Sequence, residues 1–246
     1  MRATGRIILS TGISDPDAAI LIDGVPMPVR VRRSARARAY RLTIDGTRGE
    51  LRLSMPVRAN LKRALGWAQD HEGWVRQQLA RQPVLTPLTD GAVFLLEGRE
   101  VRICWEAGAS RTIRLEGDRL LLGGAAESVG ARVLRWLVRR AKAVLETETQ
   151  ALARDHGLIV ASVGVGDPRS RWGSCTSSGA IRYSWRLILC PPEVRRATVA
   201  HELAHLLHMD HSPAFHAAHA RIYGADPKPA RAWLRAHGTG LHRYTG

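Results

Sequence analysis

Short stretches in the first half of the chain alternate apolar and polar positions, the pattern of β-strands that bury one face. The strands predicted in this way are 29–42, 50–55, 93–96, 100–105 and 112–122. Asp45-Gly46 is a turn signal between the first two, so we expect a β-hairpin there. Apolar positions at helical spacing predict a helix from Asn60 to about Ala80. We therefore expect residues 26–124 to form a small α+β unit rich in hairpins, behind a loosely ordered lead-in of residues 1–25.

Helical spacing dominates the second half of the chain. A long amphipathic helix is predicted over residues 128–156, and a further helix begins at Pro191-Pro192, because proline is well tolerated in a first turn. Strands are expected at 159–165 and 180–189. The pair Gly123-Gly124 is the predicted domain boundary, so the second domain covers residues 125–246.

The composition is that of a soluble globular protein. Of the 246 residues, 45% are hydrophobic and 24% are charged, and no apolar run reaches the roughly 20 residues of a membrane helix. The apolar stretch Ile7-Ile8-Leu9 is shorter than the core of a signal peptide. The cysteines, Cys104, Cys175 and Cys190, are too few and too scattered for a disulfide framework. We expect a cytoplasmic protein that is neither secreted nor anchored in a membrane.

The formal net charge of +15 makes nucleic acid a candidate partner. Almost all of the excess is arginine, a skew that genomic base composition can also produce. It is concentrated in the predicted strand between Arg30 and Arg41 and in a stripe on the long helix. The stripe consists of Arg132, Arg135, Arg139 and Lys142. Such a stripe is usually a solvated helix face, and Tyr40 is the only aromatic residue of the basic strand on which a base could stack. Nucleic-acid binding and a solvated surface therefore stay open as alternatives.

The most informative stretch is His201-Glu202-Leu203-Ala204-His205, on the helix predicted after Pro191-Pro192. Two histidines four residues apart lie about 40° apart around a helix and about 6 Å apart along it. Both imidazoles can therefore reach one tetrahedral metal ion, and nitrogen ligands suit Zn²⁺. Glu202 can accept a proton from a water molecule at the metal and later pass it to a leaving amine. This is the HExxH pattern of zinc metallopeptidases, in which Glu202 is the catalytic acid/base.

A catalytic zinc needs a third protein ligand. The candidates that follow the motif are His208, His211, His216 and His219. On an unbroken helix His211 would point away from the metal, so it can ligate only if the helix ends near Met209-Asp210 and the chain turns back. Ser212-Pro213 is typical of a helix exit. The spacing from His201 to His211 is that of the metzincins, but His208 replaces the glycine of their pattern, and we expect His208 to lie one turn beyond the ion.

The second half of the chain carries a series of motifs in one order: Ser170-Arg171-Trp172-Gly173-Ser174-Cys175, Trp185-Arg186-Leu187-Ile188-Leu189, Pro191-Pro192-Glu193-Val194, His201-Glu202-Leu203-Ala204-His205-Leu206 and His211-Ser212-Pro213-Ala214-Phe215. This series closely resembles the YgjP-like metallopeptidase family and, more distantly, the SprT-like domains. The strong match covers about residues 165–220. A weaker match extends to the basic hairpin at 30–55, the helix of Trp74 and the strand of Gly98.

The resemblance implies a zincin-like (minigluzincin) fold of the α+β class. It also implies one Zn²⁺ per chain, bound by His201, His205 and His211, with Glu202 as the catalytic acid/base. Two departures from the family stand out: Ser184-Trp185-Arg186, where the family usually has Asn-Trp-Arg, and Phe215-His216, where it usually has Phe-Trp. His216 then has three open roles, as a spare ligand, a transition-state donor or a surface substitution.

Further residues are candidates for contacts with the substrate or the transition state. They are Arg171, Ser174, Tyr183 and His216, with His219 and Tyr223 as additional donors. Arg171 or Ser174 could position a substrate carbonyl or carboxylate, whereas Trp172 and Gly173 also have a structural interpretation, as packing and turn residues. We expect no chemical role for Cys175.

We therefore expect a zinc-dependent peptidase that hydrolyses bonds in a peptide or protein substrate. An alternative is a metal-dependent nucleotide phosphohydrolase, a pyrophosphatase whose arginines hold the phosphates, although the chain has no P-loop and no cluster of carboxylates. Another is a nucleic-acid-associated protease similar to the SprT-like proteins.

Overall fold

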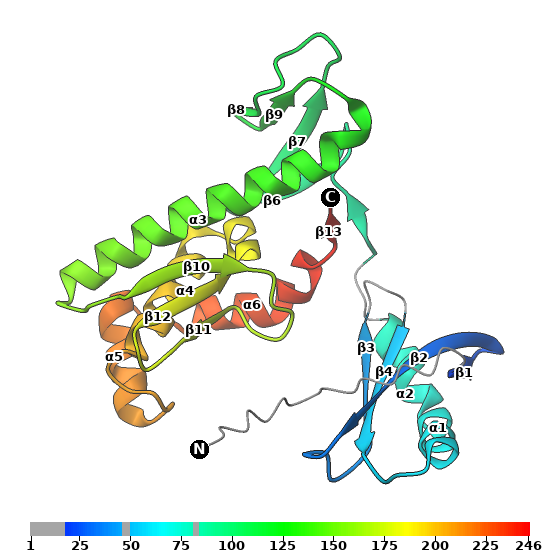
Figure 1. Ribbon diagram of the computed structural model, residues 1–246. Helices are drawn as coiled ribbons and strands as arrows, with labels where there is room; N and C mark the ends of the chain where they lie inside the picture. Colours follow the sequence, from blue (N-terminus) through cyan, green and yellow to red (C-terminus); the bar gives the residue numbers. More distant parts are fainter. Residues whose placement is uncertain (1–17, 46–49, 81–83) are drawn as a thin grey trace, which may run out of the picture. The chain divides into compact units, whose positions relative to one another are not determined.

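The computed structural model describes residues 18–45, 50–80 and 84–246. The chain forms two compact units, Met1–Gln82 and Pro83–Gly246, which are described one at a time (Figure 1). The predicted boundary at Gly123-Gly124 falls inside the second unit. A Cβ at Gly123 would overlap the carbonyl of Ala109, and Gly124 has a φ of +88°. These glycines are therefore required by a tight turn within one unit and do not form a linker.

In the first unit two helices pack on a four-stranded sheet. The strands are β1 (Ala19–Ile22), β2 (Val25–Ser34), β3 (Arg41–Asp45) and β4 (Glu50–Pro56), in the order β1-β2-β4-β3. β3 and β4 pair antiparallel, as the predicted hairpin requires, while β2 pairs parallel with the other edge of β4. The stretch predicted over 29–42 is thus two strands. β1 lies in the predicted lead-in; all four of its residues are apolar, so no alternation revealed that Ile20 and Ile22 are buried.

The helix predicted over 60–80 is divided into α1 (Leu61–Asp70) and α2 (Glu72–Ala80). Asn60 caps α1, because its side chain accepts a hydrogen bond from the N–H of Arg63 at 3.1 Å. The N–H of His71 closes the end of α1 on the carbonyl of Ala68. The core of this unit is formed by buried side chains of both layers: Leu51, Leu53, Met55, Ala64, Ala68 and Val75.

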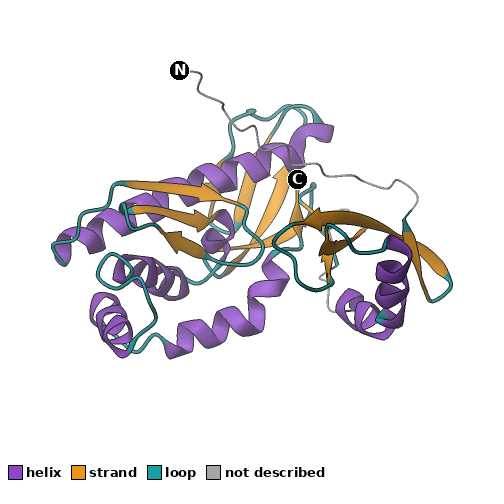
Figure 2. Cartoon of the chain, turned by 60° about the horizontal axis from the view of Figure 1, so that its bottom comes forward, coloured by secondary structure: helices purple, strands orange, loops and turns teal. Residues whose placement is uncertain are grey.

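The second unit begins with a sheet in the order β6-β7-β9-β8. Its strands are β6 (Val93–Leu96), β7 (Arg99–Trp105), β8 (Arg114–Glu116) and β9 (Arg119–Leu122). Gly117, with a φ of +61°, turns the chain between β8 and β9, so the stretch predicted over 112–122 is a pair of strands. A short 3-10 helix, η1 (Ala126–Ser128), leads into α3 (Val129–Asp155), the long helix that the sequence predicts (Figure 2). Phe94, Ile103 and Leu120 of the sheet share one core with Leu137 of α3.

A second sheet follows α3, in the order β10-β12-β11, with β10 parallel to β12. Its strands are β10 (Ser162–Gly166), β11 (Gly173–Cys175) and β12 (Ala180–Ser184). The predicted strand over 180–189 ends at Ser184, whose side chain accepts a hydrogen bond from the N–H of Arg186, and the buried 3-10 helix η2 (Trp185–Leu189) replaces the rest. The remaining helices are α4 (Pro192–Ala204), α5 (Pro213–Tyr223) and α6 (Lys228–Leu241). β13 (Tyr244–Thr245) then pairs with β5 (Thr86–Pro87) at the start of the unit.

Two buried arginines fix the helices of this unit. Arg195 of α4 forms a bidentate hydrogen-bonded pair with Glu148 of α3, with a shortest distance of 2.7 Å. Arg186 of η2 pairs with Asp167 and donates to the carbonyl of Leu241 at 2.8 Å. Because both guanidiniums are nearly inaccessible to solvent, these pairs hold α4 and the end of α6 in fixed register on the scaffold.

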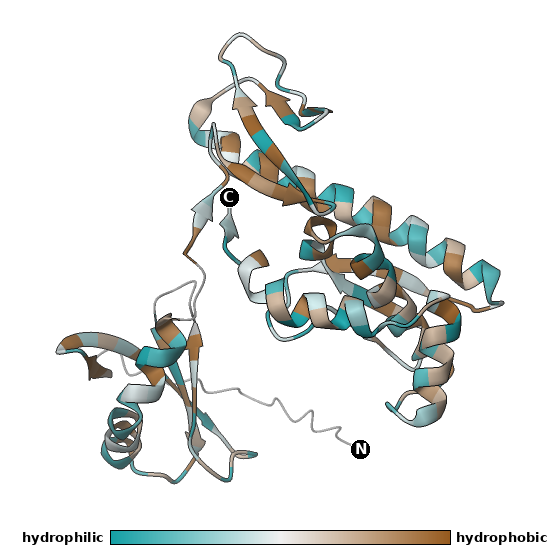
Figure 3. Ribbon diagram, turned by 180° about the vertical axis from the view of Figure 1, so that it is seen from behind, coloured by the Kyte–Doolittle hydropathy of each residue, from teal (hydrophilic) through white to brown (hydrophobic). Residues whose placement is uncertain are grey.

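Hydrophobic and hydrophilic residues alternate along the ribbon of α3, as Figure 3 shows. Its buried face includes Val133, Leu137 and Leu145, while Arg135 and Arg139 are exposed. None of the helices in the described part of the chain is both long enough and apolar enough to span a bilayer.

Candidate metal centre

The centre is built on the last turn of α4 and the loop that follows it. Pro191 caps α4, and Pro192 occupies its first turn, where a missing N–H costs nothing. The helix ends at Ala204, and the N–H groups of Leu207 and His208 both bond to the Ala204 carbonyl. The regular helix thus ends within the HExxH motif, one further hydrogen-bonded turn reaches His208, and the chain then turns away just before Met209-Asp210, close to the predicted end.

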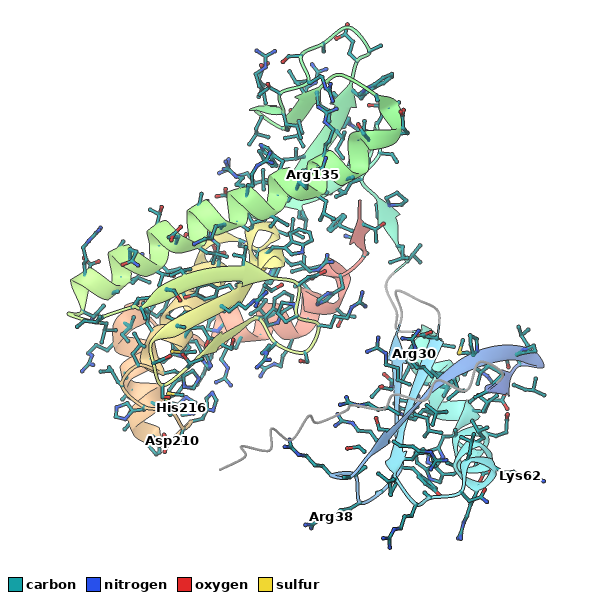
Figure 4. The ribbon with its side chains drawn as sticks, in the orientation of Figure 1. Arg30, Arg38, Lys62, Arg135, Asp210 and His216 are labelled. Carbon is teal, nitrogen blue, oxygen red and sulfur yellow. The ribbon has the colours of Figure 1, made fainter. Side chains whose placement is uncertain are left out.

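This exit brings a third histidine back to the first two. One ligand nitrogen from each of His201, His205 and His211 lies within 4.8 Å of the others. The Nε2 atoms of His201 and His211 are 3.3 Å apart. Ser212 then caps α5 through the N–H of Phe215, which fixes the direction in which the chain continues. Figure 4 labels Asp210 and His216 on either side of this turn.

The second ring nitrogen of His205 is already engaged. Its Nδ1 lies 3.1 Å from the carbonyl oxygen of His208, so it donates there and leaves Nε2 free. A backbone carbonyl in this position is the usual device that orients a metal-ligating imidazole. His208 thus contributes its carbonyl to the centre.

Burial keeps the imidazoles of α4 in the form that binds metals. It lowers the pKa of His201 to about 3, with further contributions from the neighbouring His219 and His205. The pKa of His205 is also lowered, chiefly by burial. Neutral imidazoles are therefore favoured, and only neutral imidazoles ligate. Three imidazole nitrogens that converge in this way fit a divalent ion such as Zn²⁺.

Glu202, which stands between His201 and His205 in the motif, is buried in the interior of the unit. It is 3% exposed, and its Oε2 atom has no hydrogen-bond partner among the described residues. Burial raises the pKa of Glu202 to about 7, an effect that Arg171 partly offsets. A buried carboxylate with a free oxygen and a pKa near neutrality is suited to accept and return a proton.

Gly173 of β11 makes room for this carboxylate. A Cβ built on Gly173 would overlap Oε1 of Glu202 and lie 2.7 Å from its Cγ. The Arg-Trp-Gly-Ser-Cys motif thus meets the HExxH helix through a glycine. From the sequence, Gly173 was interpreted only as a turn residue. Its proximity to Glu202 is a contact between distant segments, which the local sequence pattern does not reveal.

A cavity of about 210 Å³ opens beside Glu202 and His201. Its apolar wall includes Trp172, Val194 and Leu234, and Arg171 and Arg231 bring two exposed guanidiniums to it. Arg231 could not be predicted from the sequence, because α6 carries no motif. Only the tertiary fold brings the Arg231 side chain to the cavity.

The remaining predicted site residues differ in whether they reach the cavity. His219 is buried and its Nε2 donates to the carbonyl of Ala197 at 2.9 Å, so it borders the cavity with that nitrogen engaged. His216 is exposed, with its ring 6.4 Å from that of His211. Tyr183 is fully buried and its hydroxyl bonds to Thr149, which corrects its assignment as a substrate contact. Neither Ser174 nor Tyr223 lines the cavity.

Cys175 follows Ser174 on β11 and is half-buried. Burial and the nearby Glu202 raise the pKa of its thiol. A protonated thiol is a poor nucleophile, and the absence of a chemical role for Cys175 stays a prediction.

A buried glutamate between two helical histidines, with a third histidine returning from the following loop, is the arrangement of metal-dependent hydrolases of the HExxH class. The comparison with protein families identifies the class more closely: the YgjP-like metallopeptidase domain matches residues 38–237, and the chain belongs to this family. The match extends over both compact units, as the weaker part of the resemblance predicted. No curated protein and no solved structure shows a significant match to the chain.

Proposed function

We propose that this chain is a zinc-dependent peptidase with the zincin-like core that the resemblance implies. The observation that carries the proposal is the unpartnered Oε2 of Glu202, held in a buried position beside the three converging histidines. His201, His205 and His211 would hold one Zn²⁺ per chain. The metal supplies a Lewis acid that polarises the scissile carbonyl and lowers the pKa of water.

Glu202 performs the proton transfers. As a carboxylate it takes a proton from the attacking water, and as an acid it returns that proton to the amine that leaves. Its pKa of about 7 places both forms within easy reach near neutral pH. Gly173 and the wall of β11 keep the carboxylate at one distance from the histidines, because the space behind it is filled.

The cavity beside Glu202 is the proposed binding site for the substrate chain. Its apolar wall suits an uncharged side chain, and the cationic pair Arg171 and Arg231 favours an anionic group over a lysine or arginine. The same pair supports the second candidate, a metal-dependent nucleotide phosphohydrolase, in which these guanidiniums would hold phosphates. We also propose a cytoplasmic location, since all three cysteines are free thiols.

Metal content and activity test the proposal together. Protein purified without added metal should contain about one zinc per chain. His211→Ala should lose it, while His237→Ala, an exposed histidine on α6, should keep it. His216→Ala tests the remaining alternative ligand, and its loss of zinc would contradict the assignment of His211.

Glu202→Gln should keep the metal but lose at least about 100-fold in the hydrolysis of a quenched-fluorescence peptide library. Release of phosphate or pyrophosphate from nucleoside triphosphates, measured on the same samples, separates the two candidate reactions. Hydrolysis of nucleotides without cleavage of any peptide would replace the first candidate with the second.

A further inference from the structure

A second cavity lies in the second unit, lined by none of the residues that line the metal-centre cavity. The loop between β7 and β8 and the first half of α3 form it. Its volume of about 460 Å³ is within the range of ligand pockets, roughly 300–1,000 Å³. Its lining includes Trp136 and the guanidiniums of Arg111, Arg132, Arg135 and Arg139. Figure 4 labels Arg135 on the first half of α3.

One of these arginines has a structural role. Arg132 donates to the carbonyls of Gly123 and Arg111, and so fixes the β7–β8 loop against α3. This contact makes the cavity a built feature of the fold, because the loop that forms its far wall is tied to the helix.

Among the described residues, the other three arginines have no anionic partner. Arg111, Arg135 and Arg139 are exposed, and no carboxylate of the described residues lies within ion-pair distance of any of them. The later turns of the same helix differ, since Arg140 pairs with Glu97 and Lys142 with Glu146. Within the basic stripe, Lys142 is therefore neutralised, whereas Arg135 and Arg139 at the cavity have no carboxylate partner among the described residues. Three unneutralised guanidiniums at one concave site favour a ligand with more than one negative charge.

Trp136 adds a flat apolar surface to the same cavity. Its indole is half-buried, and the guanidinium of Arg140 lies over the ring at 5.7 Å from the ring centroid. Phosphates alone do not need such a surface, whereas the base of a nucleotide stacks on it.

We propose that this cavity binds single-stranded nucleic acid, with Arg111, Arg135 and Arg139 on the phosphates and Trp136 stacked on a base. Arg135 and Arg139 lie about 6 Å apart along the helix axis, a separation suited to successive phosphodiesters. A duplex would hide its bases from Trp136, and a flat lipid surface would not enter a cavity. The inference is independent of the metal centre and of the reaction proposed for it.

Fluorescence anisotropy of a labelled oligothymidylate of about 12 nucleotides, with the full chain at about 50 and 200 mM salt, tests this site. The decisive variant is Arg111→Gln/Arg135→Gln/Arg139→Gln. Its matched control is Arg154→Gln/Arg221→Gln/Arg235→Gln, which removes the same charge from exposed arginines of the same unit. We expect at least about tenfold weaker binding for the first and less than about threefold for the control. Circular dichroism and thermal melting check that both variants fold.

Trp136→Leu separates stacking from charge. It should weaken binding at least about fivefold while leaving the salt dependence unchanged, because no phosphate contact is lost. Glu202→Gln should bind as wild type does, which keeps this test apart from the proposed catalysis. Three results would overturn the proposal. They are absence of oligonucleotide binding at the lower salt, equal weakening of binding by the two triple variants, and wild-type affinity of Trp136→Leu. The proposal would also be overturned if ATP or anionic phospholipid vesicles bound as tightly as the oligonucleotide and this binding were lost in the Arg111→Gln/Arg135→Gln/Arg139→Gln variant.

Discussion

Gly173 of β11 and Glu202 of α4 lie in such close contact that the glycine cannot carry a side chain. A Cβ at this position would overlap Oε1 of the carboxylate. The two residues come from different motifs, and their contact joins the second sheet to the HExxH helix. The position of the proposed base therefore depends on a residue outside the HExxH motif.

Gly173→Ala should displace Glu202 without removing it. A shift of about 1 Å in a catalytic group can cost about 100-fold in rate, so we expect kcat to fall at least about tenfold while zinc content is retained. Gly108→Ala is the control, because a Cβ there meets nothing within 4 Å. Metal analysis and peptide hydrolysis on both variants measure the effect, and full activity of Gly173→Ala would show that the carboxylate position is not critical.

The sequence predicts which residues form the candidate centre, but only part of how they are arranged in space. His201, Glu202 and His205 are placed by helical periodicity alone, which is a local property. The prediction that His211 is a ligand depended on where α4 ends. The regular helix ends at Ala204 and a last turn reaches His208, close to the predicted exit at Met209-Asp210, although residues 206–210 contain no glycine or proline to mark it. The family motif nevertheless indicated His211, the histidine that the fold brings to His201 and His205.

Contacts between distant segments were beyond sequence patterns. Arg231 reaches the cavity only because α6 packs on α4. Tyr183 was a candidate donor because the sequence does not show that its hydroxyl is buried against Thr149. The same reason explains why the predicted domain boundary falls inside one unit. A pair of glycines is as typical of a tight turn as of a linker. Ile103 and Leu137, which lie on either side of the pair, share one core, so the glycines form a turn within the unit.

Arg231 should determine which side chains the cavity accepts. Arg231→Gln removes one of its two cations, so kcat/KM should fall up to about tenfold for a peptide with glutamate near the scissile bond. For the matching peptide with glutamine the change should be small. Arg235→Gln, one turn later on α6 and outside the cavity, should alter neither. Equal losses for both peptides in Arg231→Gln would indicate a structural role for Arg231 in place of selectivity.

Arg195 should be essential for the stability of the second unit. Its side chain is 4% exposed and pairs with Glu148 at 2.7 Å, so Arg195→Ala leaves a partly buried carboxylate, 23% exposed, without its partner. We expect the free energy of unfolding to fall by about 3–5 kcal/mol, measured by urea denaturation. Arg196→Ala, the exposed neighbour, should change it by less than about 0.5 kcal/mol. A small loss for Arg195→Ala would mean that water replaces the guanidinium.

His242 should make the protein sensitive to acid. Burial is the main cause of its lowered pKa; Arg186 and Arg169 lower it further and Asp167 opposes them. The folded chain therefore binds a proton at His242 less readily than the unfolded chain, whose histidines titrate near pH 6.5. The stability contributed by neutral His242 is complete above that pH and is lost as the pH falls below it. Urea denaturation at about pH 7.5 and 5.5 in the presence of a chelator should show a smaller loss for His242→Gln than for wild type. His237→Gln, an exposed histidine on the same helix, should retain the wild-type pH dependence. If His242→Gln retains it as well, the acid sensitivity comes from other groups.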